Sequence, residues 1–256
     1  MSSVKVLPAS PTTQIGMTSE KYETTQLITN TPSSDRPLVF SGDSLNFKSS
    51  SGWPEGGYGF PMTDTGCPAV VEGSTWQTGS RYQHTNDNGV NEWSPILHFQ
   101  QGSYGARYME QHFCMKTEIP GTYDWPAGSY CVFRYGFYCP NGMPNGHIEW
   151  DDEDLANQNS KNGTVPAGTY NRHTRIYFCC MTVGDVSQPI TLPTQNPFYL
   201  FPYNSEQCQA VTGMTATQEY FAWSQENSAG LPSQGSHPYT ILDGGMLKIS
   251  YCYYSE

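Results

Sequence analysis

Two distant stretches of the sequence share one spacing of four residue types, and this spacing constrains the fold more than any other feature. In each stretch a Trp is followed by a Glu after 3 residues, by an Ile after 26 and by a Cys after 29. The matched pairs are Trp150/Trp223, Glu153/Glu226, Ile176/Ile249 and Cys179/Cys252. Four coincident offsets at a long period indicate an internal repeat.

A second pair of matched segments extends the repeat toward the N-terminus. Residues 53–58 and 125–130 both read W-P-x-G-x-Y, and a Cys-Pro follows 14 residues after each Trp, at Cys67 and Cys139. Together the two matches predict three diverged units, at about residues 53–114, 125–180 and 190–252. Each unit has an early Cys, a closing aromatic-Cys segment and a central Trp, which we place at Trp93, Trp150 and Trp223.

The closing segments of the units have the composition of β-strands. Residues 108–115, 174–181 and 246–254 are rich in β-branched and aromatic side chains, and Gly and Asn flank them. The 25 Gly and 19 Pro of the chain interrupt every candidate helix. We therefore expect an all-β, disulfide-stapled domain of many short strands, arranged as a β-sandwich or in a barrel-like form, over residues 52–256. Residues 1–51, rich in Ser, Thr and Pro, are expected to form an N-terminal arm.

The repeat also predicts how the eight cysteines pair. Joining the early Cys of each unit to its closing Cys leaves Cys131 and Cys180 for each other, because Cys179 and Cys180 point to opposite faces of a strand. The predicted bridges are Cys67–Cys114, Cys139–Cys179, Cys131–Cys180 and Cys208–Cys252. A bond between the adjacent Cys179 and Cys180 is the alternative, although ordinary disulfide geometry disfavours it.

Charge and cysteine content narrow the partners and the compartment. The net charge is −11 with only 12 Lys and Arg, so we expect no nucleic acid partner and no anionic membrane surface. No apolar run approaches the roughly 18 residues of a transmembrane span. An even cysteine count without a CxxC motif favours an oxidising compartment, so we expect a secreted, extracellular protein. The N-terminus lacks the apolar centre of a signal peptide, which leaves open either a removed leader or an intracellular form.

Motifs throughout residues 52–256 resemble the ApeC domain, the C-terminal module of apextrin and apextrin-like proteins of marine invertebrates. The resemblance includes all eight cysteines and rests on these segments: Trp53-Pro54, Gly66-Cys67-Pro68, His112-Phe113-Cys114, Trp125-Pro126-Ala127-Gly128-Ser129-Tyr130-Cys131, Ile148-Glu149-Trp150-Asp151-Asp152-Glu153-Asp154, Phe178-Cys179-Cys180, Pro197-Phe198-Tyr199-Leu200, Cys208-Gln209-Ala210-Val211 and Tyr251-Cys252-Tyr253-Tyr254. It implies a role in innate immunity by recognition of bacterial peptidoglycan and muramyl dipeptide, or a place in extracellular matrix.

Aromatic and basic residues are the candidate ligand contacts. Tyr and Trp offer flat apolar faces to sugar rings at low entropic cost, although alternation along a strand turns about half of them inward. Arg172 and Arg175 could bind a muramyl carboxylate through charge-assisted hydrogen bonds, or could instead neutralise the acidic run beside them. The candidate ligand-binding residues are Tyr199, Tyr203, Tyr253, Tyr254, Arg172 and Arg175.

A run of carboxylates admits two interpretations. Asp151, Asp152 and Asp154 supply the oxygen ligands that Ca²⁺ requires, but their spacing is not that of an EF-hand loop. A solvated acidic turn explains the same run. Elsewhere, Asn162-Gly163-Thr164 fits an acceptor for an N-linked glycan if the chain is secreted.

Enzymatic functions find little support. A muramidase needs two carboxylates across a cleft, and nothing marks a proton donor among Asp151, Glu153 and Glu226. A cysteine peptidase needs a thiolate near a His, and the predicted bridges use every Cys. There is no G-x-S-x-G motif of a serine hydrolase. We therefore expect a protein that is not an enzyme.

The function that these features favour is pattern recognition by non-covalent binding. We expect a lectin-like, aromatic and Asn/Gln-rich surface that binds bacterial cell-wall glycopeptide and requires no cofactor. Two alternatives from other classes stay open. One is a structural or adhesive matrix protein that self-associates, and the other is a glycan-binding lectin that depends on Ca²⁺.

Overall fold

The computed structural model describes residues 52–70, 75–100, 103–121, 123–153, 155, 157–227 and 233–256. This part of the chain is all-β and contains 15 strands. The predicted arm at residues 1–51 lies outside the described residues. The strands are β1 (Tyr58–Pro61), β2 (Trp76–His84), β3 (Glu92–Trp93), β4 (Tyr104–Gly105), β5 (Tyr108–Lys116), β6 (Tyr130–Arg134), β7 (Asn145–Trp150), β8 (Ser160–Gly163), β9 (Gly168–Tyr170), β10 (Thr174–Met181), β11 (Phe198–Pro202), β12 (Thr215–Ser224), β13 (Gln234–Gly235), β14 (Thr240–Asp243) and β15 (Met246–Ser255).

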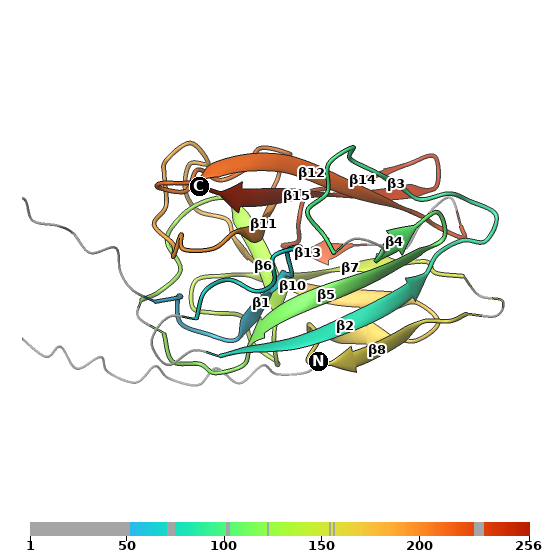
Figure 1. The fold of residues 1–256 in the computed structure, drawn as a ribbon, viewed down its shortest axis with the longest axis horizontal. Helices are drawn as coiled ribbons and strands as arrows, with labels where there is room; N and C mark the ends of the chain where they lie inside the picture. The colour runs from blue at the N-terminus through green and yellow to red at the C-terminus, as the bar shows by residue number, and fades with distance from the viewer. Residues whose placement is uncertain are drawn as a thin grey trace, which may run out of the picture. The chain divides into compact units, whose positions relative to one another are not determined.

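The strands form one antiparallel sheet system that does not close into a barrel. Its main path runs β3-β12-β15-β11-β6-β1-β5-β2-β8. In Figure 1, β12 and β15 lie along one side of the molecule and β2, β5 and β8 along the other, with β1, β6 and β11 between them. The described residues contain no helix of the length and apolarity that a membrane crossing requires.

The three predicted units share one pattern of strand pairing. In each unit the first strand pairs with the closing strand, which pairs in turn with a middle strand: β1-β5-β2, β6-β10-β7 and β11-β15-β12. The register is also shared, because a closing Cys stands opposite the third residue of each first strand, in the pairs Phe60/Cys114, Val132/Cys179 and Leu200/Cys252. The first strands then join the units, since β6 pairs with both β1 and β11.

Backbone hydrogen bonds close a ring through the ends of the middle strands. Glu153 N donates to His84 O at 3.2 Å, and Glu226 N donates to Asp151 O at 3.0 Å. Asn86 N donates to Ser224 O at 3.3 Å and completes the circuit from the third unit back to the first. The repeat seen in the sequence therefore corresponds to three units, each of which is hydrogen-bonded to the other two.

The same register corrects one part of the sequence alignment. The middle-strand residues opposite the closing cysteines are Thr78, Asn145 and Gln218, and five residues further along lie Gln83, Trp150 and Trp223. Trp93 is therefore not the counterpart of the other two Trp residues. It lies in β3, 36% exposed and paired with Phe221, whereas Trp150 and Trp223 are buried with ring centroids 5.5 Å apart.

At several equivalent core positions the second and third units have apolar residues, whereas the first unit has polar ones. Trp150, Trp223, Ile176 and Ile249 belong to one large buried cluster. In the closing strand of the first unit, the residue that corresponds to Ile176 and Ile249 is Gln111. In its middle strand, the residue that corresponds to the apolar residues Ile148 and Phe221 is Arg81. The Arg81 guanidinium is buried and lies 4.7 Å from the centre of the Trp150 ring.

All eight cysteines are in disulfides. The bridges are the four that the repeat predicts, Cys67–Cys114, Cys131–Cys180, Cys139–Cys179 and Cys208–Cys252. The adjacent Cys179 and Cys180 do not bond to each other.

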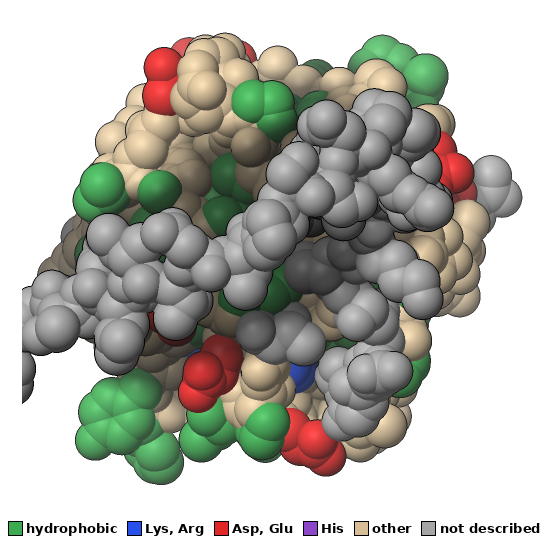
Figure 2. All heavy atoms as spheres, turned by 90° about the vertical axis from the view of Figure 1, so that its left-hand side faces the viewer, with side chains coloured by type: hydrophobic (Ala, Val, Ile, Leu, Met, Phe, Trp, Pro, Cys, Tyr) green, Lys and Arg blue, Asp and Glu red, His purple; other side chains and the backbone are tan. Residues whose placement is uncertain are grey.

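Figure 2 looks onto one end of the molecule, where hydrophobic and acidic side chains lie next to one another with little Lys or Arg in view.

Candidate functional site

Three of the four candidate tyrosines are core residues, so the prediction that they contact a ligand is wrong for them. Tyr199 and Tyr254 have no exposed surface and Tyr253 is 7% exposed. Tyr199 Oη donates to Glu219 Oε2 at 2.6 Å, and Tyr254 Oη donates to the carbonyl of Gln209 at 2.7 Å. Strands β11 and β15 lie inside the sheet system and are covered on both faces, so alternation turns no aromatic ring to solvent there.

Tyr203 remains a candidate. It is half-buried and lines a pocket of about 220 Å³. The neighbouring Asn204 has a φ of 62°, in the left-handed region that non-glycine residues seldom adopt. The pocket is lined by Tyr203, Asn204, Gly235, His237, Pro238, Tyr239 and Thr240.

Of the two candidate arginines, Arg175 is paired with a carboxylate of the protein itself. Arg175 donates through Nε and Nη2 to Glu149 Oε2, at 2.8 and 2.5 Å. This hydrogen bonding raises the pKa of Arg175. The partner of Arg175 is thus a carboxylate outside the acidic run. Arg172 is exposed, and its carbonyl accepts a hydrogen bond from Asn157.

The acidic run is not a solvated turn, because Asp151, Asp152 and Glu153 are buried. Asp152 accepts hydrogen bonds from Gln83, Asn159 and Thr174 at 2.5 to 2.7 Å, and burial raises its pKa to about 6. Asp151 Oδ2 accepts from the backbone and side chain of Asn227. Asp154, the third proposed Ca²⁺ ligand, lies outside the described residues. No group of three or more His, Cys, Asp or Glu among the residues that are described is arranged to hold a metal.

The W-P-x-G-x-Y motif forms a turn that its own Tyr closes. Tyr58 Oη donates to the carbonyl of Pro54 at 3.0 Å, and Tyr130 Oη donates to that of Pro126 at 2.5 Å. A third copy, which the sequence analysis missed, is P-A-G-T-Y at residues 166–170, where Tyr170 Oη donates to Pro166 O at 2.7 Å. The shorter signal P-x-G-x-Y would have found it.

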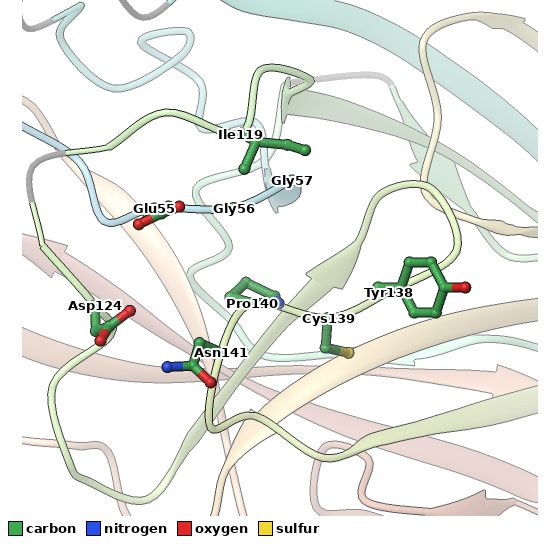
Figure 3. Close-up of a pocket in the computed structure, with 9 residues that line it drawn as sticks. All are labelled: Glu55, Gly56, Gly57, Ile119, Asp124, Tyr138, Cys139, Pro140 and Asn141. Carbon is green, nitrogen blue, oxygen red and sulfur yellow. The ribbon is translucent and has the colours of Figure 1, made fainter.

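The first of these turns forms a wall of the pocket that we take as the candidate site. Gly56 has a φ of +109°, and Pro140 packs against its Cα. The pocket has a volume of about 290 Å³, and Figure 3 shows the carboxylates of Glu55 and Asp124 and the amide of Asn141 on one side of it. Its full lining is Glu55, Gly56, Gly57, Ile119, Asp124, Tyr138, Cys139, Pro140 and Asn141.

A buried ammonium group holds two walls of this pocket together. Lys116 Nζ donates to the carbonyls of Gly56, Glu118 and Pro120 at 3.1, 2.6 and 2.7 Å. The Lys116 side chain is fully buried, and this burial lowers the pKa of its amine. The interactions join the turn at Gly56 to the loop that carries Ile119, so the shape of the pocket depends on Lys116.

Two neighbouring aromatic side chains project into solvent, Tyr138, which lines the pocket, and Phe137, the residue before it. Phe137 is 88% exposed and Tyr138 is 86% exposed. The disulfide between Cys139 and Cys179 ties their loop to β10. The sequence analysis missed both residues, although their position between Gly136 and the Cys139-Pro140 pair marks a turn rather than a strand.

The related place between the second and third units is filled. Gln209 follows Cys208 as Pro140 follows Cys139, and it has no exposed surface. Its Oε1 accepts from Ser129 N at 2.8 Å and its Nε2 donates to Gln188 O at 2.7 Å. A long amide therefore occupies this place, whereas Pro140 lies against Gly56 at the related place between the first and second units, where the candidate pocket is found.

Comparison with known protein families matches residues 53–254 to ApeC, the C-terminal domain of apextrin. No curated protein and no solved structure matches the chain. The match includes all three units and all four disulfides, and disulfides of this number are typical of extracellular proteins. The chain therefore belongs to the ApeC family and is an apextrin-like extracellular protein.

Proposed function

We propose that the protein is secreted and binds bacterial cell-wall glycopeptide non-covalently at the pocket beside Gly56 and Pro140. The observation that carries the proposal is the combination of two exposed aromatic rings, Phe137 and Tyr138, with three exposed polar side chains, those of Glu55, Asp124 and Asn141. Aromatic faces pack against the C–H faces of sugar rings, while carboxylate and amide groups bind hydroxyl and N-acetyl groups.

The rigidity of the pocket supports a recognition role. The aromatic loop is anchored by Cys139–Cys179, and the opposite wall is anchored by Lys116. Little conformational entropy is then lost when a ligand binds, which favours affinity from a small contact area. The peptidoglycan component of the proposal comes from the resemblance to apextrin-like proteins.

The proposed binding is non-catalytic and needs no cofactor. Every Cys is in a disulfide, so no thiolate is available as a nucleophile. The polar groups of the pocket suffice for hydrogen bonding to a sugar without an ion. Retention of binding in a chelator would separate this proposal from a lectin that depends on Ca²⁺.

Retention on insoluble peptidoglycan tests the proposal. We expect the wild-type protein to be retained on peptidoglycan, released by soluble muramyl dipeptide, and not retained on chitin or cellulose. Tyr138→Ser should weaken retention about 5- to 30-fold, because it removes an exposed aromatic face worth about 1 to 2 kcal/mol.

Tyr203→Ser is the matched control, because it removes the same group from the pocket at Asn204. If Tyr203→Ser abolished retention and Tyr138→Ser did not, the site would be the pocket at Asn204. Retention on all three polysaccharides, or on none, would contradict the proposal and favour a self-associating matrix protein.

A further inference from the structure

Strand β8 (Ser160–Gly163) forms one free end of the sheet. It pairs with β2, and no other described strand pairs with it. All four of its residues are exposed. A free strand edge offers unpaired N–H and C=O groups to other chains, so soluble proteins usually cover or charge such an edge.

This edge strand contains the single N-x-S/T sequence of the chain, Asn162-Gly163-Thr164. Asn162 is paired with Ser80 across the strands. Because the next residue of β2, Arg81, is buried in the core, Ser80 and Asn162 face outward. The side chain of Asn162 is exposed on the outer face of the sheet, and the ring of Tyr82 is its diagonal neighbour there.

The end of the strand is held in a defined conformation. Gly163 has a φ of +65°, and a Cβ atom added there would lie 2.5 Å from the carbonyl oxygen of Thr78. Thr164 N donates to the same oxygen at 3.0 Å. The backbone therefore needs Gly at position 163 and fixes the position from which Asn162 projects.

We propose that Asn162 carries an N-linked glycan and that this glycan covers the free edge of β8. In the reaction Asn162 Nδ2 forms a bond to C1 of an oligosaccharide and loses one proton. The bond from C1 to the pyrophosphate of the lipid-linked donor breaks, and the lipid pyrophosphate leaves. No oxidant or reductant is needed. The branched, hydrated sugar hinders a second chain from pairing with β8, in the way that charged residues protect other edges.

Production of the full chain in a secreting eukaryotic host tests the modification. We expect the intact mass to fall by one glycan after digestion with an amidase that cleaves N-linked glycans, and the site to map to Asn162. Asn162→Gln and Thr164→Ala should lose the glycan, while Thr164→Ser should keep it. Secreted wild-type protein with an unmodified Asn162 would overturn the proposal.

Self-association tests the second half of the proposal. Thr164→Ala protein should form dimers and larger species at concentrations where wild-type and Thr164→Ser protein stay monomeric by sedimentation velocity. Enzymatic removal of the glycan from folded wild-type protein should have the same effect, which excludes misfolding of the variant as the cause. The amidase leaves Asp at position 162, whose charge also opposes edge pairing, so unchanged monomer content in both the Thr164→Ala protein and the deglycosylated protein would show that the glycan does not protect the edge.

Discussion

Pro140 packs directly against Gly56, so that a Cβ atom added to Gly56 would lie 2.8 Å from Cγ of Pro140. The contact joins the first unit to the second and forms one wall of the candidate pocket. Gly56→Ala is therefore expected to destabilise the protein by about 1 to 3 kcal/mol and to weaken peptidoglycan retention.

Gly66→Ala is the control for Gly56→Ala, because Gly66 has a similar φ of +104° but nothing within 4 Å of its added Cβ. Both substitutions incur backbone strain, and only Gly56→Ala displaces Pro140. Equal unfolding free energies for the two variants in urea would show that the contact with Pro140 is unimportant.

Lys116 stabilises the pocket walls through the carbonyls of Gly56, Glu118 and Pro120. Lys116→Met keeps most of the volume of the side chain but removes the ammonium group that donates to these carbonyls. We therefore expect a loss of about 2 to 4 kcal/mol in unfolding free energy. Lys161→Met, at an exposed position on β8, should cost less than about 1 kcal/mol. Urea denaturation of the two variants measures the difference, and similar losses would contradict the role of Lys116.

Asp152 makes the stability of the protein depend on pH. Burial raises its pKa from 3.8 to about 6 in the folded state, so protons bind more tightly to the folded chain than to the unfolded one. The contribution of protonated Asp152 to the free energy of unfolding is fully present below about pH 4 and is lost as the pH rises through 6. The free energy of unfolding changes by up to about 3 kcal/mol over this range.

Asp152→Asn should remove this contribution. We expect the difference in unfolding free energy between the wild-type protein and the variant to change by 2 to 3 kcal/mol between about pH 4 and pH 7. Denaturation at several pH values measures it. A constant difference across that range would mean that Asp152 titrates at an ordinary pKa.

Removal of the Cys139–Cys179 bridge by paired Ser substitutions should lower both stability and binding. The bridge spans 40 residues, which corresponds to about 4 kcal/mol in the chain-entropy description. Removal of Cys208–Cys252, which spans 44 residues, should cost a similar free energy but leave the loop of Phe137 and Tyr138 anchored. Calorimetry and peptidoglycan retention distinguish the two pairs, and equal losses of binding would argue against a role for the loop.

Strand positions and disulfide pairing could be predicted because both depend on order along the chain. The expected strands at 108–115, 174–181 and 246–254 correspond to β5, β10 and β15. β-branched and aromatic side chains favour extended backbone wherever they cluster. The repeat matched each early Cys to its closing Cys. The number of residues between the two cysteines is similar in the three units, although their loops differ in sequence.

The alignment failed where a loop changed length. Trp93 was matched with Trp150 and Trp223 by its position along the chain, but the register of β2 and β5 places Gln83 there instead. Gln83 donates to Asp152 from this buried place. Residue type alone could not identify a Gln as the counterpart of two Trp residues.

The sequence by itself determined an all-β chain of three related units with four disulfides, because periodicity and spacing are properties of the chain in one dimension. Tertiary structure alone decided which aromatic rings meet solvent and where a pocket opens. Alternation shows that a strand has two faces, but only its neighbours show whether both faces are covered, as they are at Tyr199 and Tyr254. The pocket is assembled from segments near residues 55, 119, 124 and 140, which approach one another only when the units pack.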